Sequence, residues 1–171
     1  HVTTAAERGK AVKVEDIWID IGVADREAAE ELVRVGDAVT YDLGMQELQD
    51  DLAVARAFDN KVGAWVVAEA LRRARPGKLD AAVVVVATVQ EEIGLRGATT
   101  SAFGVDPTVA VAVDVTHATD SPGMNKKTVG DVKLGGGPVI ARGANINPVV
   151  EKMLFAAAAD AGIEVQVEAE S

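Results

Sequence analysis

The second half of the chain alternates between amphipathic stretches and short, almost continuously apolar runs. Residues 62–74 carry apolar side chains at helical spacing, and a Pro-Gly pair follows. The run at 81–89 is rich in Val, which is typical of a strand buried on both faces. The same criteria predict helices within 95–103 and over 148–161, and strands at 108–115 and 163–167. This alternating order predicts an α/β fold with a three-layer sheet.

The first part of the chain has a different pattern, with more β-branched residues and weaker helical periodicity. We therefore predict that residues 1–55 are part of a β-rich module and that residues 56–171 are part of an α/β domain. The elements predicted in the first part are a strand at 12–21, a helix at 26–33 capped by Asp25, and a strand at 38–41.

Composition narrows the classes of function. The 171 residues include 27 acidic and 17 basic side chains, which give a formal charge of −10. This charge repels a phosphate backbone, so we predict no nucleic-acid partner. The absence of Cys excludes disulfides and thiolate metal sites. No apolar run approaches the roughly 20 residues of a membrane span, so we predict no membrane partner and a cytoplasmic protein.

Four carboxylates stand where an open α/β sheet gathers its reactive groups. Glu91 and Glu92 directly follow the first apolar strand, Asp114 ends the second, and Asp59 lies just before the first helix. Because ligands bind beyond the carboxyl ends of such strands, we expect these side chains to converge. Carboxylates bind hard and borderline cations, and two cations about 3.5–4 Å apart form a hydrolytic clamp. The pattern predicts a two-metal site in which one carboxylate stays free to act as general base.

Each carboxylate also has a plainer interpretation. Asp59 is placed to be a helix N-cap, and Asp114 to cap the turn that follows it. Glu91 and Glu92 can be read as a solvated pair, although their place after an apolar run favours the crevice. His117 is interpreted as a rim residue without a metal bond.

Other hydrolase mechanisms fit the sequence less well. A glycosidase needs two carboxyls facing each other across a sugar, roughly 5–9.5 Å apart. Neighbouring residues of a strand point to opposite faces, so Glu91 and Glu92 are poorly placed for that task. The sequence has no GxSxG motif and no Cys nucleophile. The glycines at 135–137 lack the GxxxxGK[ST] pattern of a phosphate loop.

Three separated motifs indicate a particular protein family. They are AFDNKVG at 57–63, TVQEEIGLRGA at 88–98 and AVDVT at 112–116. In this order and spacing they closely resemble the cobalt- or zinc-dependent aminopeptidases of the tetrahedral, self-compartmentalising type. That family includes glutamyl and deblocking aminopeptidases, and some members carry the name endoglucanase. Residues 13–22 and 133–138 also look like the family.

The resemblance implies a three-layer sandwich of the zinc-exopeptidase type and a β-rich insert domain that pairs subunits. It implies two divalent metal ions, Zn or Co, with Asp59 bridging both metals and Glu92 and Asp114 binding one each. Glu91 is then the general base. The implied function is removal of N-terminal residues from peptide substrates by a homo-oligomer, a tetrahedral dodecamer.

The chain departs from the family pattern in its histidines. The family uses a His-x-Asp motif before the insert domain and a late His, and His1 and His117 match neither. Three of the five expected protein ligands are therefore present. The initiator Met is also missing, so we interpret the chain as the middle of a longer protein. Two alternatives follow, namely an incomplete and catalytically inactive fragment and an endoglucanase-named member of the same family.

Overall fold

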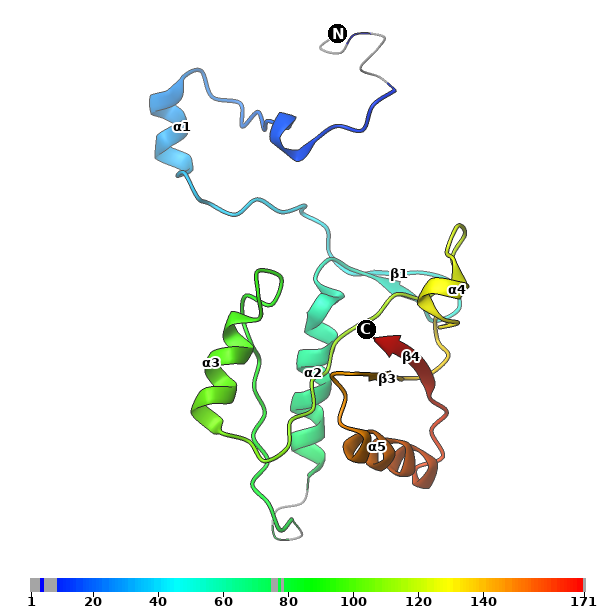
Figure 1. Ribbon diagram of the computed structural model, residues 1–171. Helices are drawn as coiled ribbons and strands as arrows, with labels where there is room; N and C mark the ends of the chain where they lie inside the picture. Colours follow the sequence, from blue (N-terminus) through cyan, green and yellow to red (C-terminus); the bar gives the residue numbers. More distant parts are fainter. Residues whose placement is uncertain (1–3, 5–8, 75–76, 78, 171) are drawn as a thin grey trace. The chain divides into compact units, whose positions relative to one another are not determined.

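Helices and short strands follow one another along the chain in a mixed α/β arrangement (Figure 1). The computed structural model describes residues 4, 9–74, 77 and 79–170. The chain divides into two units, residues 1–43 and 44–171, here called the N-terminal and C-terminal units. No helix within these described residues is long and apolar enough to cross a lipid bilayer.

The N-terminal unit contains two short helical segments. The 3₁₀ turn η1 (Val14–Asp16) lies where the sequence predicts a strand over 12–21, so that prediction is wrong. Helix α1 (Arg26–Leu32) agrees with the prediction, and Asp25 caps it by accepting a hydrogen bond from the Ala28 N–H at 3.0 Å. Residues 38–41 do not form a strand in the described structure, so this prediction is wrong as well. High β-propensity leads to a strand only where a neighbouring strand completes the ladder of hydrogen bonds.

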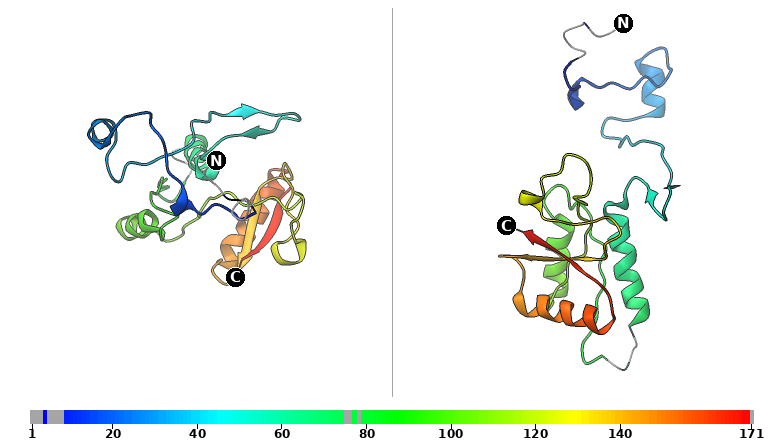
Figure 2. Two further views of the ribbon diagram at one scale, coloured as in Figure 1. Left: turned by 90° about the horizontal axis from the view of Figure 1, so that it is seen from above. Right: turned by 90° about the vertical axis from the view of Figure 1, so that its right-hand side faces the viewer.

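The C-terminal unit contains one parallel strand pair with its crossover helix. Strand β3 (Val139–Gly143) pairs with β4 (Gln166–Glu170), from Val139 opposite Gln166 to Gly143 opposite Glu170. Helix α5 (Pro148–Asp160) connects them and runs along one side of the pair in both Figures 1 and 2. The Asn147 side chain caps this helix and Pro148 takes its first turn, as the sequence predicts.

Two of the predicted buried strands are not part of a sheet. Residues 81–89 and 108–115 are not hydrogen-bonded to a neighbouring strand, and most of their Val side chains are exposed, for example Val84 at 56% and Val109 at 61%. The prediction that these runs are buried on both faces is therefore wrong for the described structure. An apolar run shows that burial of the segment is favourable. Whether it is buried depends on other parts of the fold that could cover it.

The remaining described elements complete the C-terminal unit. A hairpin joins β1 to β2 in antiparallel register, with Gln46 opposite Val54. The hairpin strands and the further helices are β1 (Gln46–Glu47), β2 (Ala53–Val54), α2 (Phe58–Arg73), α3 (Arg96–Val105) and α4 (Lys126–Val129).

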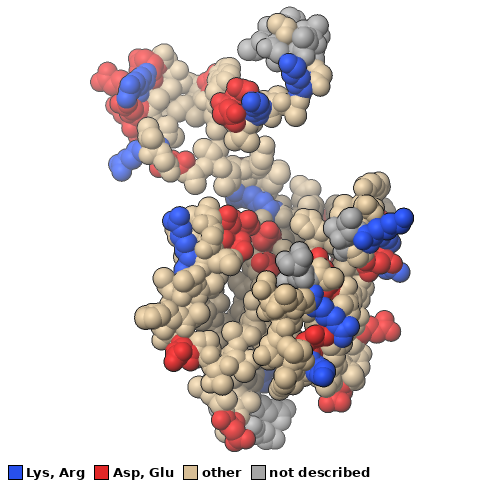
Figure 3. Space-filling model, in the orientation of Figure 1, with Lys and Arg blue, Asp and Glu red and all other residues tan. Residues whose placement is uncertain are grey.

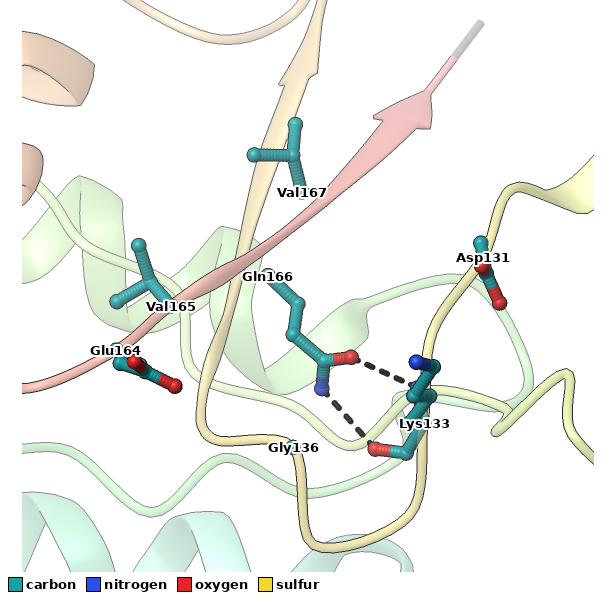
Figure 4. A pocket seen from close by; sticks show the side chains of 7 residues that line it. All are labelled: Asp131, Lys133, Gly136, Glu164, Val165, Gln166 and Val167. Atoms are coloured by element: carbon teal, nitrogen blue, oxygen red, sulfur yellow. Dashed lines mark hydrogen bonds between the residues drawn. The ribbon is translucent and has the colours of Figure 1, made fainter.

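A long loop before β3 is fixed by side chains that imitate strand pairing. Thr119 and Val132 are buried, with 2% and 3% exposure, and they exchange three hydrogen bonds of 2.7–3.1 Å. The Gln166 amide accepts from the Lys133 N–H at 2.7 Å and donates to the Lys133 carbonyl at 3.0 Å (Figure 4). The hydrogen bonds of Gln166 connect the loop to β4.

The C-terminal end of α2 carries a compact ionic cluster. Glu69 accepts hydrogen bonds from Arg72 Nε at 2.6 Å and Nη2 at 2.7 Å, and from Arg73 Nε at 2.6 Å. These bonds, those of Arg72 first, lower the pKa of the Glu69 carboxyl from 4.5 to about 2. Arginines in the last turn also suit the helix dipole.

This ionic cluster predicts how the stability of the fold changes in acid. Because the pKa of Glu69 is depressed in the folded state, its contribution is complete above pH 4.5 and is lost as the pH falls through about 2. We expect the wild type to unfold at a higher temperature than Glu69→Gln at neutral pH, with a difference that shrinks between pH 4.5 and 2. Thermal unfolding of both proteins across this range measures it. A difference that does not change with pH contradicts the assignment.

Candidate active site

Asp59 lies at an irregular start of α2. Its backbone angles, φ −83° and ψ 110°, and those of Asn60, φ −120° and ψ 51°, are not helical, and the peptide bond between them is cis. The N-cap of α2 is Ala57, which makes no side-chain capping bond, and Asn60 Oδ1 accepts from the Gly63 N–H at 2.8 Å. The interpretation of Asp59 as a simple N-cap is therefore wrong, because Asn60 caps the regular part of the helix. The Asp59 carboxylate is exposed.

Asn60 also joins the start of α2 to the segment that carries Asp114. Its Nδ2 donates to the Val113 carbonyl at 2.8 Å, across 53 positions of sequence. Asp59 and Asp114 each lie one residue from this bond. The structure thus brings together two of the segments that the sequence predicted to converge.

Asp114 does not act as a cap for the following turn. Its Oδ1 accepts from the N–H of its own neighbour, Val115, at 2.7 Å. This bond leaves Oδ2 with no hydrogen bond among the described residues, and the residue is exposed. One carboxylate oxygen of Asp114 is thus oriented by the backbone, and the other is available to bind a cation.

Glu91 and Glu92 lie in a closed turn between the 81–89 segment and α3. The Glu91 carbonyl accepts from the N–H groups of Gly94 and Leu95, each at 3.0 Å, and the Gly97 N–H donates to the Val89 carbonyl at 3.0 Å. A Cβ on Gly97 would lie 2.5 Å from the Val89 backbone, so only glycine permits this approach. The two glutamates are therefore held by backbone contacts while their side chains are exposed.

Glu91 and Glu92 lie in a turn, whereas the sequence predicts that they are consecutive residues of an extended strand. The alternating side-chain directions of a strand therefore do not exclude a glycosidase arrangement of this pair.

Unusual backbone conformations flank three of the carboxylates. Ala57 has φ 62°, Gln90 has φ 57° and Leu95 has φ 55°, in the left-handed region that non-glycine residues rarely adopt. Ala57 lies two residues before Asp59, and the other two enclose the Glu91-Glu92 turn. Such conformations concentrate at functional sites, where neighbouring contacts hold them in place.

Acidic side chains gather over the start of α2 and over the turn that precedes α3 (Figure 3). The acidic residues of these two segments are Asp59 at the first and Glu91 and Glu92 at the second. The described residues nevertheless include no group of three or more His, Cys, Asp or Glu that could hold a metal ion. A two-metal site with Asp59 shared between the ions requires Asp59, Glu92 and Asp114 to lie close together, so the described structure does not show the predicted convergence of all four carboxylates.

A hollow in the C-terminal unit is not this site. It has a volume of about 670 Å³ and is open to solvent beside β4 (Figure 4). Its lining residues are Asp131, Lys133, Gly136, Glu164, Val165, Gln166 and Val167. None of the four predicted carboxylates is among them.

Sequence reasoning missed Asn60 as a structural part of the site. The available signal was its position three residues before Gly63, because Asn is a preferred N-cap whose side chain bonds the N–H three residues later. Its second bond, to Val113, has no signal in a single sequence.

The chain is similar in structure and in sequence to aminopeptidases. The structure is similar to the crystal structure of a TET aminopeptidase from a marine-sediment archaeon, Thaumarchaeota archaeon, with a TM-score of 0.82 and 34% sequence identity. The similarity covers 100% of this chain and 49% of that one.

The chain belongs to the M42 glutamyl aminopeptidase family, whose pattern it matches over residues 1–171. It is 35% identical to the lysyl aminopeptidase of Pyrococcus furiosus over 165 residues, which are 96% of this chain and 46% of that protein. It is 39% identical to an aminopeptidase-named protein of Acetivibrio thermocellus over 162 residues, 93% and 47% of the two chains. The chain thus spans about half the length of these relatives. The resemblance seen in the motifs is confirmed at the level of the family.

Proposed function

We propose that the protein is a metalloaminopeptidase that hydrolyses N-terminal residues from peptides. The observation that carries the proposal is the hydrogen bond from Asn60 to Val113, which holds the segments of Asp59 and Asp114 together in a chain of an aminopeptidase family. Carboxylate donors of this kind suit zinc or cobalt, and their exposure leaves their oxygens accessible to a cation.

Each carboxylate has a role in this proposal. Asp59 would be shared by two divalent ions, zinc or cobalt, while Glu92 and Asp114 would hold one ion each. When bound, the two metals supply Lewis acidity toward the scissile carbonyl and the attacking water. Glu91 takes the proton of that water and passes it to the leaving amine. The turn that holds both glutamates fixes their backbone, so the division between base and ligand depends on where each side chain points.

The proposal extends to architecture and assembly. Residues 56–171 belong to a three-layer catalytic domain, and residues 1–55 to a β-rich insert domain that pairs subunits. The protein acts in the cytoplasm as a homo-oligomer, a tetrahedral dodecamer. The support for self-assembly is the similarity to a TET aminopeptidase and the exposure of many large apolar side chains, Trp18 at 72% and Ile17 at 58% among them.

A catalytically inactive piece is the second candidate, and one observation favours it. The described residues hold no group of three metal-binding side chains, and a site with fewer ligands binds a divalent ion weakly. The two candidates therefore differ in whether peptide turnover accompanies metal binding.

The proposed function is tested by assaying the purified chain on peptides with a free N-terminus, with zinc, with cobalt and with a chelator. We expect metal-dependent release of the N-terminal residue and no cleavage of the same peptides after N-acetylation. Release of glucose units from a β-glucan, without peptide cleavage, would favour the endoglucanase name. No turnover in any metal supports the inactive candidate.

A further inference from the structure

Asn60 uses both ends of its side-chain amide. Oδ1 accepts from the Gly63 N–H at 2.8 Å, and Nδ2 donates to the Val113 carbonyl at 2.8 Å. The residue is half-buried, so these bonds compete with little water. One side chain thus fixes the first regular turn of α2 and a segment that lies 53 positions further along the chain.

Gly63 makes the space that Asn60 occupies. It is the only buried residue of α2. A Cβ at this position would lie 2.3 Å from Asn60 Oδ1, 2.7 Å from Nδ2 and 2.9 Å from Cγ. The Asn60 amide would have to move away, and both of its hydrogen bonds end on the atoms that move. The position of the Asn60 amide therefore depends on the absence of a side chain at Gly63.

We propose that Asn60 is a positioning residue, which together with Gly63 sets the separation of the Asp59 and Asp114 carboxylates for a shared divalent cation. The inference rests on the proposed function. Asp59 and Asp114 belong to different segments, and the Asn60–Val113 bond is the side-chain hydrogen bond described between those segments. Because Asp114 is already oriented by the Val115 N–H, the relative placement of the two backbones decides whether both carboxylates reach one ion.

Two uncharged substitutions test the positioning role of Asn60 separately from its role as a helix cap. In Asn60→Ser the hydroxyl keeps the ability to cap α2 but is too short to reach Val113. In Gly63→Ala the new methyl group displaces the Asn60 amide. Neither changes the charge of the site.

Two control variants match these changes. Gly104→Ala in α3 adds a methyl group where no atom lies within 4 Å. Val132→Ala removes a buried side chain in the loop before β3, and so lowers stability without touching the carboxylate segments.

The experiment is a zinc titration followed by the backbone amide resonances of Asp59 and Asp114 in each protein. In the wild type, we expect both amides to follow one binding isotherm. In Asn60→Ser and Gly63→Ala, we expect zinc affinity to fall about 10–100-fold and the two amides to follow separate isotherms. Gly104→Ala and Val132→Ala should keep the common isotherm, although Val132→Ala unfolds at a lower temperature.

The outcomes distinguish the two proposals. A common isotherm with wild-type affinity in Asn60→Ser and Gly63→Ala overturns the positioning role and leaves the proposed function in place. Equal loss of affinity in Val132→Ala shows that only stability matters, and also overturns it. A wild type whose Asp59 and Asp114 amides do not respond to zinc contradicts the metal assignment itself, and the positioning role falls with it.

Discussion

Glu91→Gln is expected to lower peptide turnover by about 10²–10⁴ in the active protein, with metal content nearly unchanged. Glutamine has the shape of glutamate but accepts no proton at neutral pH, so the substitution removes a base and little else. In the proposed site Glu91 holds no metal, and the loss should appear in turnover rather than in metal binding. Peptide hydrolysis beside metal analysis of the same samples measures both quantities.

The turn around Glu91 makes this substitution a clean test of chemistry. The hydrogen bonds that close the turn, from Gly94, Leu95 and Gly97, all join backbone atoms. The Glu91 side chain is exposed and takes no part in them. The fold should therefore be unchanged, and unfolding temperatures equal to the wild type within error provide the control. Normal turnover in Glu91→Gln would place the base elsewhere.

Glu92→Gln is expected to lower the affinity for one metal ion before the other and to reduce activity through that loss. A ligand supplies negative charge to the cation, and an amide oxygen in its place is a weaker donor. Because mass action can refill a weakened site, excess zinc or cobalt should partly restore the activity of Glu92→Gln. The same addition should not restore Glu91→Gln, which lacks a base rather than a metal.

The two glutamates are matched controls for each other, since both are exposed and lie in the same turn. Metal analysis and peptide turnover, with and without added metal, compare them directly. If Glu91→Gln loses a metal and Glu92→Gln keeps both, the assigned roles are reversed. If neither substitution affects turnover, the catalytic site is not in this turn.

The family could be predicted from the sequence, and the roles of the four carboxylates stay predictions. The three motifs around Asp59, Glu91 and Asp114 identify the family, and the family match extends over the whole chain. Helices were predicted well, because capping and helical periodicity are local properties that a short segment contains in full. Asn147 with Pro148 shows this for α5, and Asp25 shows it for α1.

Strands were predicted poorly for the opposite reason. The Val-rich runs at 81–89 and 108–115 have the composition of buried strands, yet the described residues provide neither a neighbouring strand nor a covering layer for them. Pairing and burial are decided by residues distant in sequence, which periodicity does not reveal.

The sequence by itself therefore determined the family and the helices, and it proposed the four carboxylates as site residues. Only the tertiary structure decided how they are held. It placed Glu91 and Glu92 in a closed turn rather than on a strand, and it joined Asp59 to Asp114 through Asn60. The physical reason is that residue chemistry is local, whereas the Asn60–Val113 hydrogen bond forms between groups 53 positions apart that only folding brings together.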